Sequence, residues 1–380
     1  MYLKIIDRYM LRQFIQTFLI CYLSLTGLYI VFDAFTNLED FLQAAEKHGG
    51  LWNLMGPHYA YRSLFFFDRT AGMLTLVAAM FTVTWIQRHN ELTALMAAGI
   101  SRVRVILPVT SAAVVIAFLA TANRELLIPR FREELARTPQ DLMGTRAKQL
   151  QPRRDYETDI LIRGGATFAA LARIRDPKFL LPITLDDYGK QLVAANAYYC
   201  PPEGDRPGGY LLEKVRQPKD LADRPSLCLG KWPVVITPRD APGWLKPDQC
   251  FVVSNVDFEQ LTGGTGWRQF SSTAQLIRGL RNPSLDFGAD VRVAIHSRVV
   301  QPFLDITLLF LGLPLVLSRQ SRNVFIAIGL CVLVVSIFVL ITLALQQLGA
   351  SYLLDPALAA WAPLMLFVPV AVAMAHAMWE

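Results

Sequence analysis

The sequence predicts a membrane protein built as a helical bundle, six transmembrane helices in a 3 + 3 arrangement, with an all-β domain inserted between the two halves. Of the 380 residues, 53% are hydrophobic and only 18% are charged, which is too apolar for an ordinary soluble protein. The apolar residues form three long runs near each end of the chain. Between these two sets, short strand-forming segments alternate with Pro, Gly and Asp turns. These observations together predict the fold class.

The six apolar runs are each long enough to cross a hydrocarbon core of about 30 Å as a helix of about 20 residues. They lie at 14–33, 62–86, 104–122, 299–318, 324–346 and 357–378. The first run follows several basic residues and precedes no cleavage site of small residues, so we expect a retained helix rather than a signal peptide. Its foot, DRYMLRQFIQ, is expected to lie along the membrane interface. The predicted membrane segments are therefore 1–122 and 298–380.

Basic residues beside the runs predict the orientation. They fall on one side of the membrane if the chain crosses six times: Lys4, Arg8, Arg12, Arg88, Arg102, Arg104, Arg319 and Arg322. The opposite loops, 34–58 and 347–356, are poor in Lys and Arg. We therefore expect a multi-pass membrane protein with both termini and the 88–102 corner in the cytoplasm.

The middle of the chain, 123–297, is then expected in the periplasm. It holds 15 of the 22 prolines, so long helices are disfavoured there. Its β-forming segments include TFAALARI, FLLPITL, QLVAANAYY, GYLLEKV, KWPVVIT and CFVVSNVDF. This pattern predicts a β-sandwich or jelly-roll domain. Its positive charge is explained by solvated surfaces, and no nucleic-acid patch stands out.

Several kinds of chemistry are excluded by what the sequence lacks. There is no GxxxxGK[ST] phosphate loop, so we expect no ATP hydrolysis by this chain, and there is no GxSxG nucleophile motif. The five histidines are scattered without metal-ligand spacing. Cys200, Cys228 and Cys250 fit no metal knuckle, and whether two of them form a disulfide stays open. We therefore expect no catalytic residue, cofactor or metal in this chain.

The corner at 88–102, RHNELTALMAAGISR, has the features of a short, capped helix. Asn90 is the predicted N-cap, Glu91 places negative charge in the first turn, and Gly99 suits a left-handed end. Ser101 is a predicted N-cap for the following span. One apolar stripe is formed by Leu92, Leu95 and Met96. A rigid rod of this kind transmits displacement that a flexible loop would absorb.

Charged and aromatic residues inside the spans have two interpretations each. Arg62 and Arg69 are candidates for a polar cavity wall that meets lipid phosphates, but pairing of the nearby Asp68 with an arginine is the interpretation that we favour. Asp305 lies four residues after Gln301, which favours a structural hydrogen bond between them. A further set either lines acyl chains at a lateral opening or forms an interfacial aromatic belt: Tyr29, Phe32 and Phe35.

Four segments together carry a family resemblance: NELTALMAAGIS, AIHSRVVQPFLDITLLFLGLPLVLSR, LDPALAAWAPLMLF and TLDDYGKQLVAANAYY. They resemble the LptF/LptG (YjgP/YjgQ) permease family of lipopolysaccharide export. NELTALMAAGIS is similar to the family signature after the second span, and AIHSRVVQPFLDITLLFLGLPLVLSR resembles its re-entry into the membrane. LDPALAAWAPLMLF resembles its last span, and TLDDYGKQLVAANAYY resembles a strand pair of its periplasmic domain. The VFDAFTNLEDFL stretch is more similar to the LptG side than to the LptF side.

The resemblance implies a permease subunit of an ABC transporter that draws lipopolysaccharide, or a related glycolipid, from the inner membrane. It implies a paralogous permease subunit, an ATPase dimer that holds ATP and Mg, and a periplasmic bridge of jelly-roll proteins for outer-membrane assembly. It also implies that the corner is a coupling helix, with contacts to the ATPase from Glu91, Leu92, Leu95, Met96 and Gly99. Two alternatives stay open: a membrane-anchored periplasmic binding or sensory module, and the permease of a different ABC family.

Overall fold

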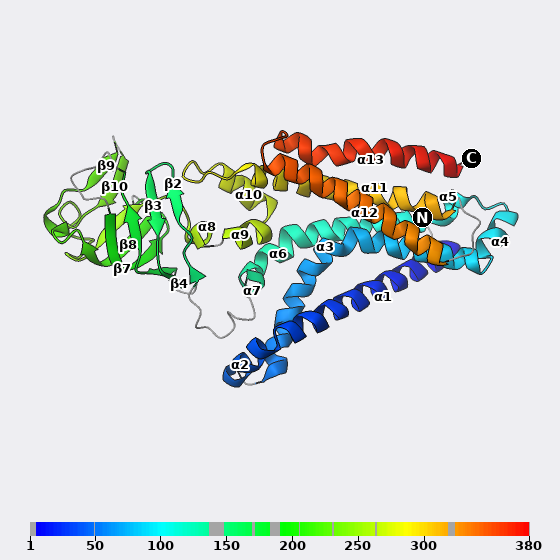
Figure 1. Ribbon diagram of the computed structural model, residues 1–380, viewed down its shortest axis with the longest axis horizontal. Coiled ribbons are helices and arrows are strands. Elements are labelled where there is room, and N and C mark those ends of the chain that lie inside the picture. Colours follow the sequence, from blue (N-terminus) through cyan, green and yellow to red (C-terminus); the bar gives the residue numbers. More distant parts are fainter. Residues whose placement is uncertain are drawn as a thin grey trace. The chain divides into compact units, whose positions relative to one another are not determined.

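The computed structural model describes residues 5–48, 50–136, 148–168, 172–182, 191–204, 206–229, 232–262, 264–317 and 324–379. The chain forms two compact units (Figure 1). The membrane unit comprises Met1–Leu142 and Gly288–Glu380, and the β unit comprises Met143–Phe287. Arg319, Arg322 and most of the TLDDYGKQ stretch lie outside the described residues. Each unit is described by itself.

Six helices of the described residues are long and apolar enough to cross a membrane, which confirms the predicted number. They are α1 (Ile5–Thr36), α3 (Leu51–Arg88), α5 (Arg102–Ala122), α11 (Ala289–Leu317), α12 (Val324–Ala350) and α13 (Pro356–Trp379). Polar residues at their ends lengthen several of these helices beyond the apolar runs. With 38 residues, α3 is about 57 Å long, nearly twice the thickness of a hydrocarbon core. The helix is therefore longer than one straight crossing of the core requires.

Short helices join the first three spans. The α1–α3 connection is α2 (Leu38–His48), whose buried Phe41 packs on His58 and Tyr59 of α3. The α3–α5 connection is α4 (Glu91–Ala97). Beyond α5 the chain stays helical through a π-helical turn (Asn123–Leu127), α6 (Ile128–Arg130) and α7 (Arg132–Ala136).

The β unit is narrower than the predicted range of 123–297. Apolar residues Leu126, Leu127 and Ile128 continue the run of α5, so the helix extends past Ala122 and groups with the membrane unit. At the other border, α11 already begins at Ala289. The β unit also contains three short helices, α8 (Phe258–Thr262), α9 (Gly264–Phe270) and α10 (Thr273–Leu280), where the sequence predicted strands and turns alone.

Glycines allow α3 and α11 to pack closely. A Cβ atom on Gly72 of α3 would collide with the Asp305 side chain of α11, and a Cβ on Gly312 of α11 would collide with Leu76 of α3. The Asp305 side chain therefore packs directly against Gly72, and the Leu76 side chain packs directly against Gly312. Such small residues at helix contacts are typical of membrane bundles, where close backbone approach adds van der Waals contact.

The β unit is an antiparallel sheet of eleven described strands. They are β1 (Lys148–Gln149), β2 (Arg153–Asp155), β3 (Ile160–Arg163), β4 (Ala166–Phe168), β5 (Arg173–Arg175), β6 (Lys178–Leu180), β7 (Gln191–Cys200), β8 (Gly209–Gln217), β9 (Leu227–Leu229), β10 (Trp232–Ile236) and β11 (Cys250–Val253). The main path of pairing runs β1-β4-β5-β7-β8-β11-β10-β9. This inserted antiparallel domain between the two halves of the bundle confirms the predicted fold class.

Beside β7, three neighbouring lines of the sheet are each broken into two short strands, and the breaks lie next to one another: β5 and β6, β4 and β3, and β1 and β2. β5 and β6 both pair with β7 in one continuous register, since Arg173 is opposite Tyr198 and Lys178 is opposite Val193. In the same way β4 and β3 pair with β5 and β6, and β1 and β2 pair with β4 and β3. The breaks fall near Pro152, Gly164 and Pro177, which are residues that disturb a ladder. Local breaks of this kind let a meander bend along one line, as a jelly-roll-like domain requires.

Alternating residues of these strands fill the core of the β unit. Phe179, Leu192, Tyr210 and Phe251 are fully buried, and the Tyr210 hydroxyl donates a 2.9 Å hydrogen bond to the Val256 carbonyl. Cys200, Cys228 and Cys250 are free thiols, so the disulfide that the sequence left open is not formed. Complete burial raises the pKa of the Cys250 thiol to about 12.

Candidate functional site

Asn90 lies at the junction of α3 and α4, at the predicted N-cap position, and its carbonyl accepts the first hydrogen bond of α4 from the Ala94 N–H at 3.0 Å, but its side chain does not cap the helix. Its φ of 58° is left-handed, and its side chain makes no capping hydrogen bond to α4. Its backbone N–H donates to the Gln87 carbonyl at 3.1 Å instead. Asparagine tolerates the left-handed conformation that follows a helix end, so Asn90 is explained by the termination of α3.

The other end of α4 is built as predicted. Gly99 has a φ of 79°, and its N–H donates to the Met96 carbonyl while the Ile100 N–H donates to the Leu95 carbonyl. This pair of bonds is a Schellman motif, which ends a helix sharply. Ser101 then caps α5, because its hydroxyl oxygen accepts a hydrogen bond from the Arg104 N–H. The short helix therefore has defined ends and leads directly into the next span.

The two faces of α4 differ in character. Leu92 is 8% exposed and belongs to the bundle core, and Leu95 packs against that core. Thr93, Ala94, Met96 and Ala97 are exposed. We call these four residues the α4 outer face. Its side chains are small apart from Met96, so the helix backbone is accessible to a partner that approaches closely.

Polar contacts fasten α4 and its neighbours to α1. The Tyr9 hydroxyl of α1 donates to the Glu91 carboxylate at 2.9 Å, and Arg104 of α5 forms a 2.7 Å ion pair with Asp7 of α1. On the other side, the Gln87 amide donates to the Val316 carbonyl of α11 at 3.3 Å. The foot of α1 is a continuous part of that helix and packs on this corner.

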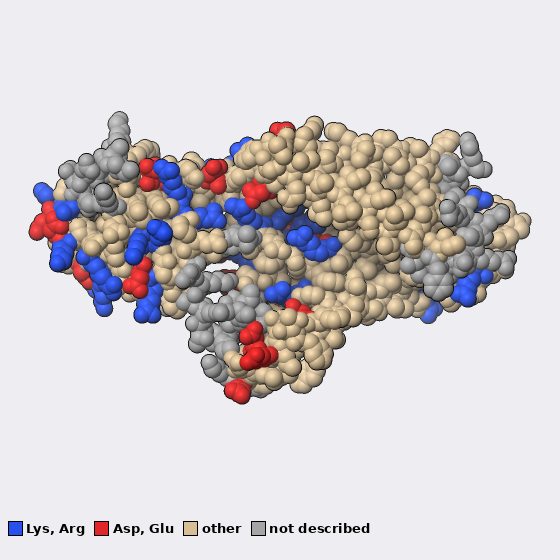
Figure 2. Space-filling model, in the orientation of Figure 1, with Lys and Arg blue, Asp and Glu red and all other residues tan. Residues whose placement is uncertain are grey.

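The charged residues of α3 do not form one cluster. Asp68 forms a 2.8 Å ion pair with Arg124, which confirms that it pairs with an arginine, although the partner lies 56 residues away. Arg69 lies over the Phe65 ring at 5.3 Å and is exposed, and Arg62 is half-buried. Figure 2 shows that Lys, Arg, Asp and Glu are sparse over much of the helical bundle. Pairing of Asp68 and Arg124 lowers the cost of charge within the spans.

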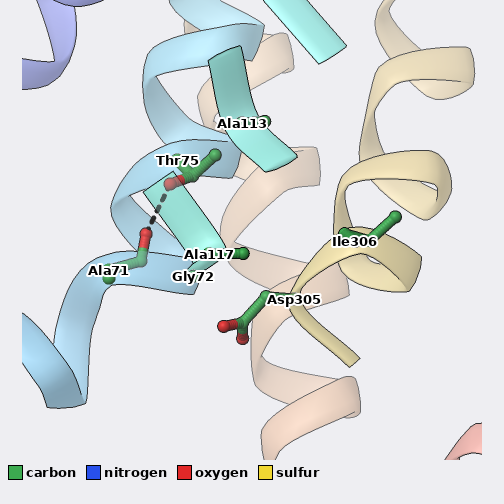
Figure 3. Close-up of a pocket in the computed structure, with 7 residues that line it drawn as sticks. All are labelled: Ala71, Gly72, Thr75, Ala113, Ala117, Asp305 and Ile306. Carbon is green, nitrogen blue, oxygen red and sulfur yellow. Dashed lines mark hydrogen bonds between the residues drawn. The ribbon is translucent and has the colours of Figure 1, made fainter. Parts of the chain in front are cut away.

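Asp305 points from α11 towards α3 and α5 (Figure 3). The Gln301 amide donates to its carboxylate at 2.9 Å, which confirms the predicted structural bond. A small pocket beside it is lined by Ala71, Gly72, Thr75, Ala113, Ala117, Asp305 and Ile306. Most of this lining is apolar, and the Thr75 hydroxyl is already bonded to the Ala71 carbonyl at 2.7 Å. The arrangement therefore packs three helices together rather than offering a polar ligand site.

Comparison with known families decides the identity of the bundle. A family model described as the lipopolysaccharide export system permease LptF/LptG matches residues 8–189 and 252–377, which is most of the chain. The chain belongs to the LptF/LptG family. The match includes all of α4 and all but the outermost residues of the six spans, and it leaves out 190–251, which hold β7 to β10. No curated protein matches the chain.

The remaining predicted site residues of this LptF/LptG permease lie on α1. Tyr29 stacks on Phe66 of α3 with 5.2 Å between ring centroids, so it is partly used within the bundle. Phe32 and Phe35 are 67% and 74% exposed. These two rings are therefore accessible to lipid or to a partner subunit, whereas Tyr29 holds α1 against α3.

Tyr9 and Asp7 were missed by the sequence reasoning. Their partners Glu91 and Arg104 are 82 and 97 residues away, so no local spacing connects them. The sequence did contain a signal for the Asp7 contact. Asp7 is an acidic residue in an otherwise basic foot, and a carboxylate beside a membrane span needs a partner. Among the described residues, no group of three or more His, Cys, Asp or Glu could hold a metal ion.

Proposed function

We propose that this permease is the transmembrane subunit of an ABC transporter that extracts lipopolysaccharide, or a related glycolipid, from the inner membrane. Membership of the LptF/LptG family supports this assignment over a sensory module or a different ABC family. The proposal includes a paralogous permease subunit and an ATPase dimer that binds ATP and Mg. It also includes a periplasmic jelly-roll bridge to which the β unit passes the lipid.

The observation that carries the coupling role is the construction of α4. The helix is seven residues long, its Schellman motif fixes its end, and its buried Leu92 joins it to the bundle core. The α4 outer face is free of bulky side chains except Met96, so it suits insertion into a groove of the ATPase. In this proposal Glu91 and Met96 border the docked surface, and Leu92, Leu95 and Gly99 hold its shape.

The lipid path is proposed to pass the outer half of α1. Phe32 and Phe35 are large, exposed apolar side chains that suit contact with acyl chains. Arg69 is exposed on α3, and Arg62 is half-buried on the same helix, so they are the candidates for contact with anionic headgroups. The proposal places α4 and both termini in the cytoplasm and the β unit in the periplasm.

Docking is tested by placing a large charge on the α4 outer face. Ala94→Arg should abolish co-purification of the ATPase with the permease while the permease inserts in the membrane at normal levels. The matched control is Ser351→Arg, since Ser351 is an exposed small residue in the turn between α12 and α13. Undiminished ATPase association in the Ala94→Arg protein would remove the docking role of α4.

A further inference from the structure

The first residues of α1 contact both sides of the corner that contains α4. Tyr9 donates to the Glu91 carboxylate, with distances of 2.9 and 3.3 Å to its two oxygens. Two residues earlier, Asp7 forms its 2.7 Å ion pair with Arg104 in the first turn of α5. One contact therefore holds the start of α4, and the other holds the helix that follows it.

Burial makes this attachment firm. Asp7, Met10, Phe14 and Phe18 recur every three or four residues, so they form one stripe of α1, and all four are buried. Met10 and Phe14 belong to the same apolar cluster as Leu92 of α4. The Asp7 residue is only 6% exposed, so separation from Arg104 would leave a carboxylate in an apolar setting. The foot of α1 is thus expected to follow the corner when it moves.

Beyond Phe18, α1 is held differently. In the rest of the helix Thr26 alone is buried. Tyrosines join this outer half to α3: the Tyr22 hydroxyl donates to the Ser63 carbonyl at 3.1 Å, and the Tyr59 hydroxyl donates to Asp33 at 3.0 Å. The outer half of α1 and the facing part of α3 therefore form a pair with its own contacts.

We infer that α1 is the lever of the permease, and that Tyr9 and Asp7 are the positioning residues that make it move with α4. The inference rests on the proposed docking of an ATPase on α4. A displacement of α4 acts on the foot of α1 through Tyr9–Glu91 and Asp7–Arg104. The stiff helix passes this displacement to the outer half, which carries the exposed Phe32 and Phe35. Residues of α11 share the apolar cluster of Leu92, but the polar contact of this end of α3 with α11 is the neutral Gln87–Val316 bond of 3.3 Å, which is a weaker attachment than an ion pair.

The test uses the full permease complex with its co-purified ABC ATPase in lipid nanodiscs. Genetically encoded spin labels replace Leu28 on α1 and Phe303 on α11, which are both exposed. The distance between the labels is measured without nucleotide and after trapping with ATP and vanadate. We expect the trapped state to shift this distance in the otherwise unchanged protein. In the Tyr9→Phe, Asp7→Asn double variant, the shift should fall by at least half, while ATPase association stays within twofold.

Two controls separate a lever from a general loss of stability. Tyr352→Phe removes another exposed tyrosine hydroxyl, in the α12–α13 turn, and should leave the shift unchanged. The exchange Asp7→Arg with Arg104→Asp should restore more of the shift than Asp7→Arg alone, because it rebuilds the ion pair.

The outcomes are distinct. A full distance shift in the double variant, or no shift in the starting protein despite a bound ATPase, overturns the lever and leaves the docking of α4 intact. Failure of the ATPase to associate with the starting protein overturns both.

Discussion

Glu91 connects the interior of the permease to its proposed partner. Its carboxylate accepts a hydrogen bond from the Tyr9 hydroxyl. In the proposed complex it also forms a charge pair with a basic residue of the ATPase. A hydrogen bond to a charged group contributes about 1.5–3 kcal/mol, and breaking an interfacial charge pair from one side costs about 2–5 kcal/mol. Loss of the partner contact should therefore outweigh loss of the internal bond.

Substitution of Glu91 separates shape from charge. Glu91→Gln keeps an oxygen that can accept from Tyr9, so we expect normal insertion and a moderate loss of ATPase association. Glu91→Lys reverses the charge, so a larger loss is expected, and an acidic substitution on the ATPase should restore part of it. Glu39→Lys, at an exposed position of α2, is the control. Wild-type assembly and transport in the Glu91→Lys protein would contradict the coupling role.

Thiol reactivity follows burial in the β unit. Because burial raises the Cys250 pKa to about 12, almost no thiolate is present at pH 8, and a maleimide should spare Cys250 but modify the exposed Cys228.

The raised pKa also has a stability consequence, since folding favours the neutral thiol. This contribution is complete below about pH 9, the unfolded value, and declines as the pH rises towards 12. Labelling of Cys250 before unfolding, detected by mass spectrometry, would contradict this assignment.

Some contacts of single residues could be predicted and others could not. The Asp305–Gln301 bond and the Gly99 helix end follow from local spacing, and both were predicted correctly. The partner of Asp68 was predicted by type alone, because Arg124 meets it only after α5 folds against α3. Asn90 is at the predicted N-cap position, but its side-chain cap was not found, because asparagine suits a capping residue and a left-handed residue alike.

The helices were predictable as elements because each apolar run must span the same thickness of membrane. Their ends were less predictable, since polar residues continue helices such as α3 beyond the apolar runs. The long strands β7 and β8 also follow from their patterns. The paired breaks of β1 to β6 depend on the alignment of three strands, which no single segment reveals.

Gly312 provides a test of how α3 and α11 pack. Gly312→Ala places a methyl group against Leu76, so we expect overpacking to cost about 1–3 kcal/mol and lower the melting temperature in detergent. In a Leu76→Ala background the colliding side chain is gone. Gly312→Ala should therefore lower the melting temperature less there than in the wild-type background. Gly27→Ala is the control, because a Cβ there meets open space within the chain. Equal effects of Gly312→Ala in both backgrounds would exclude the predicted collision.

For the whole molecule, the family match and the six spans agree on a permease, but the match omits 190–251. That stretch supplies the long β7–β8 hairpin and the edge strand β9, so the sheet is completed by residues that the family model does not match. The α4 corner, to which the coupling role is proposed, lies inside the matched part. A sequence resemblance could therefore identify the corner, while the completed sheet needed the structure.

The last prediction concerns the side of the membrane on which each part lies. The β unit follows α5, and α4 precedes it, so one crossing by α5 must place them on opposite sides. Glu203→Cys, beside Gly204, and Gln269→Cys, in the helix that begins at Gly264, should react with a membrane-impermeant maleimide added to cells with a permeable outer membrane. Thr93→Cys, three residues after Asn90, should react only after the inner membrane is opened.

Because Cys228 is exposed, all three variants are compared in a Cys228→Ser background. Thr93 is used in place of Asn90 itself, whose left-handed backbone resists substitution. Labelling of Thr93→Cys from outside intact inner membranes would reverse the orientation, and it would remove α4 from the reach of any cytoplasmic ATPase.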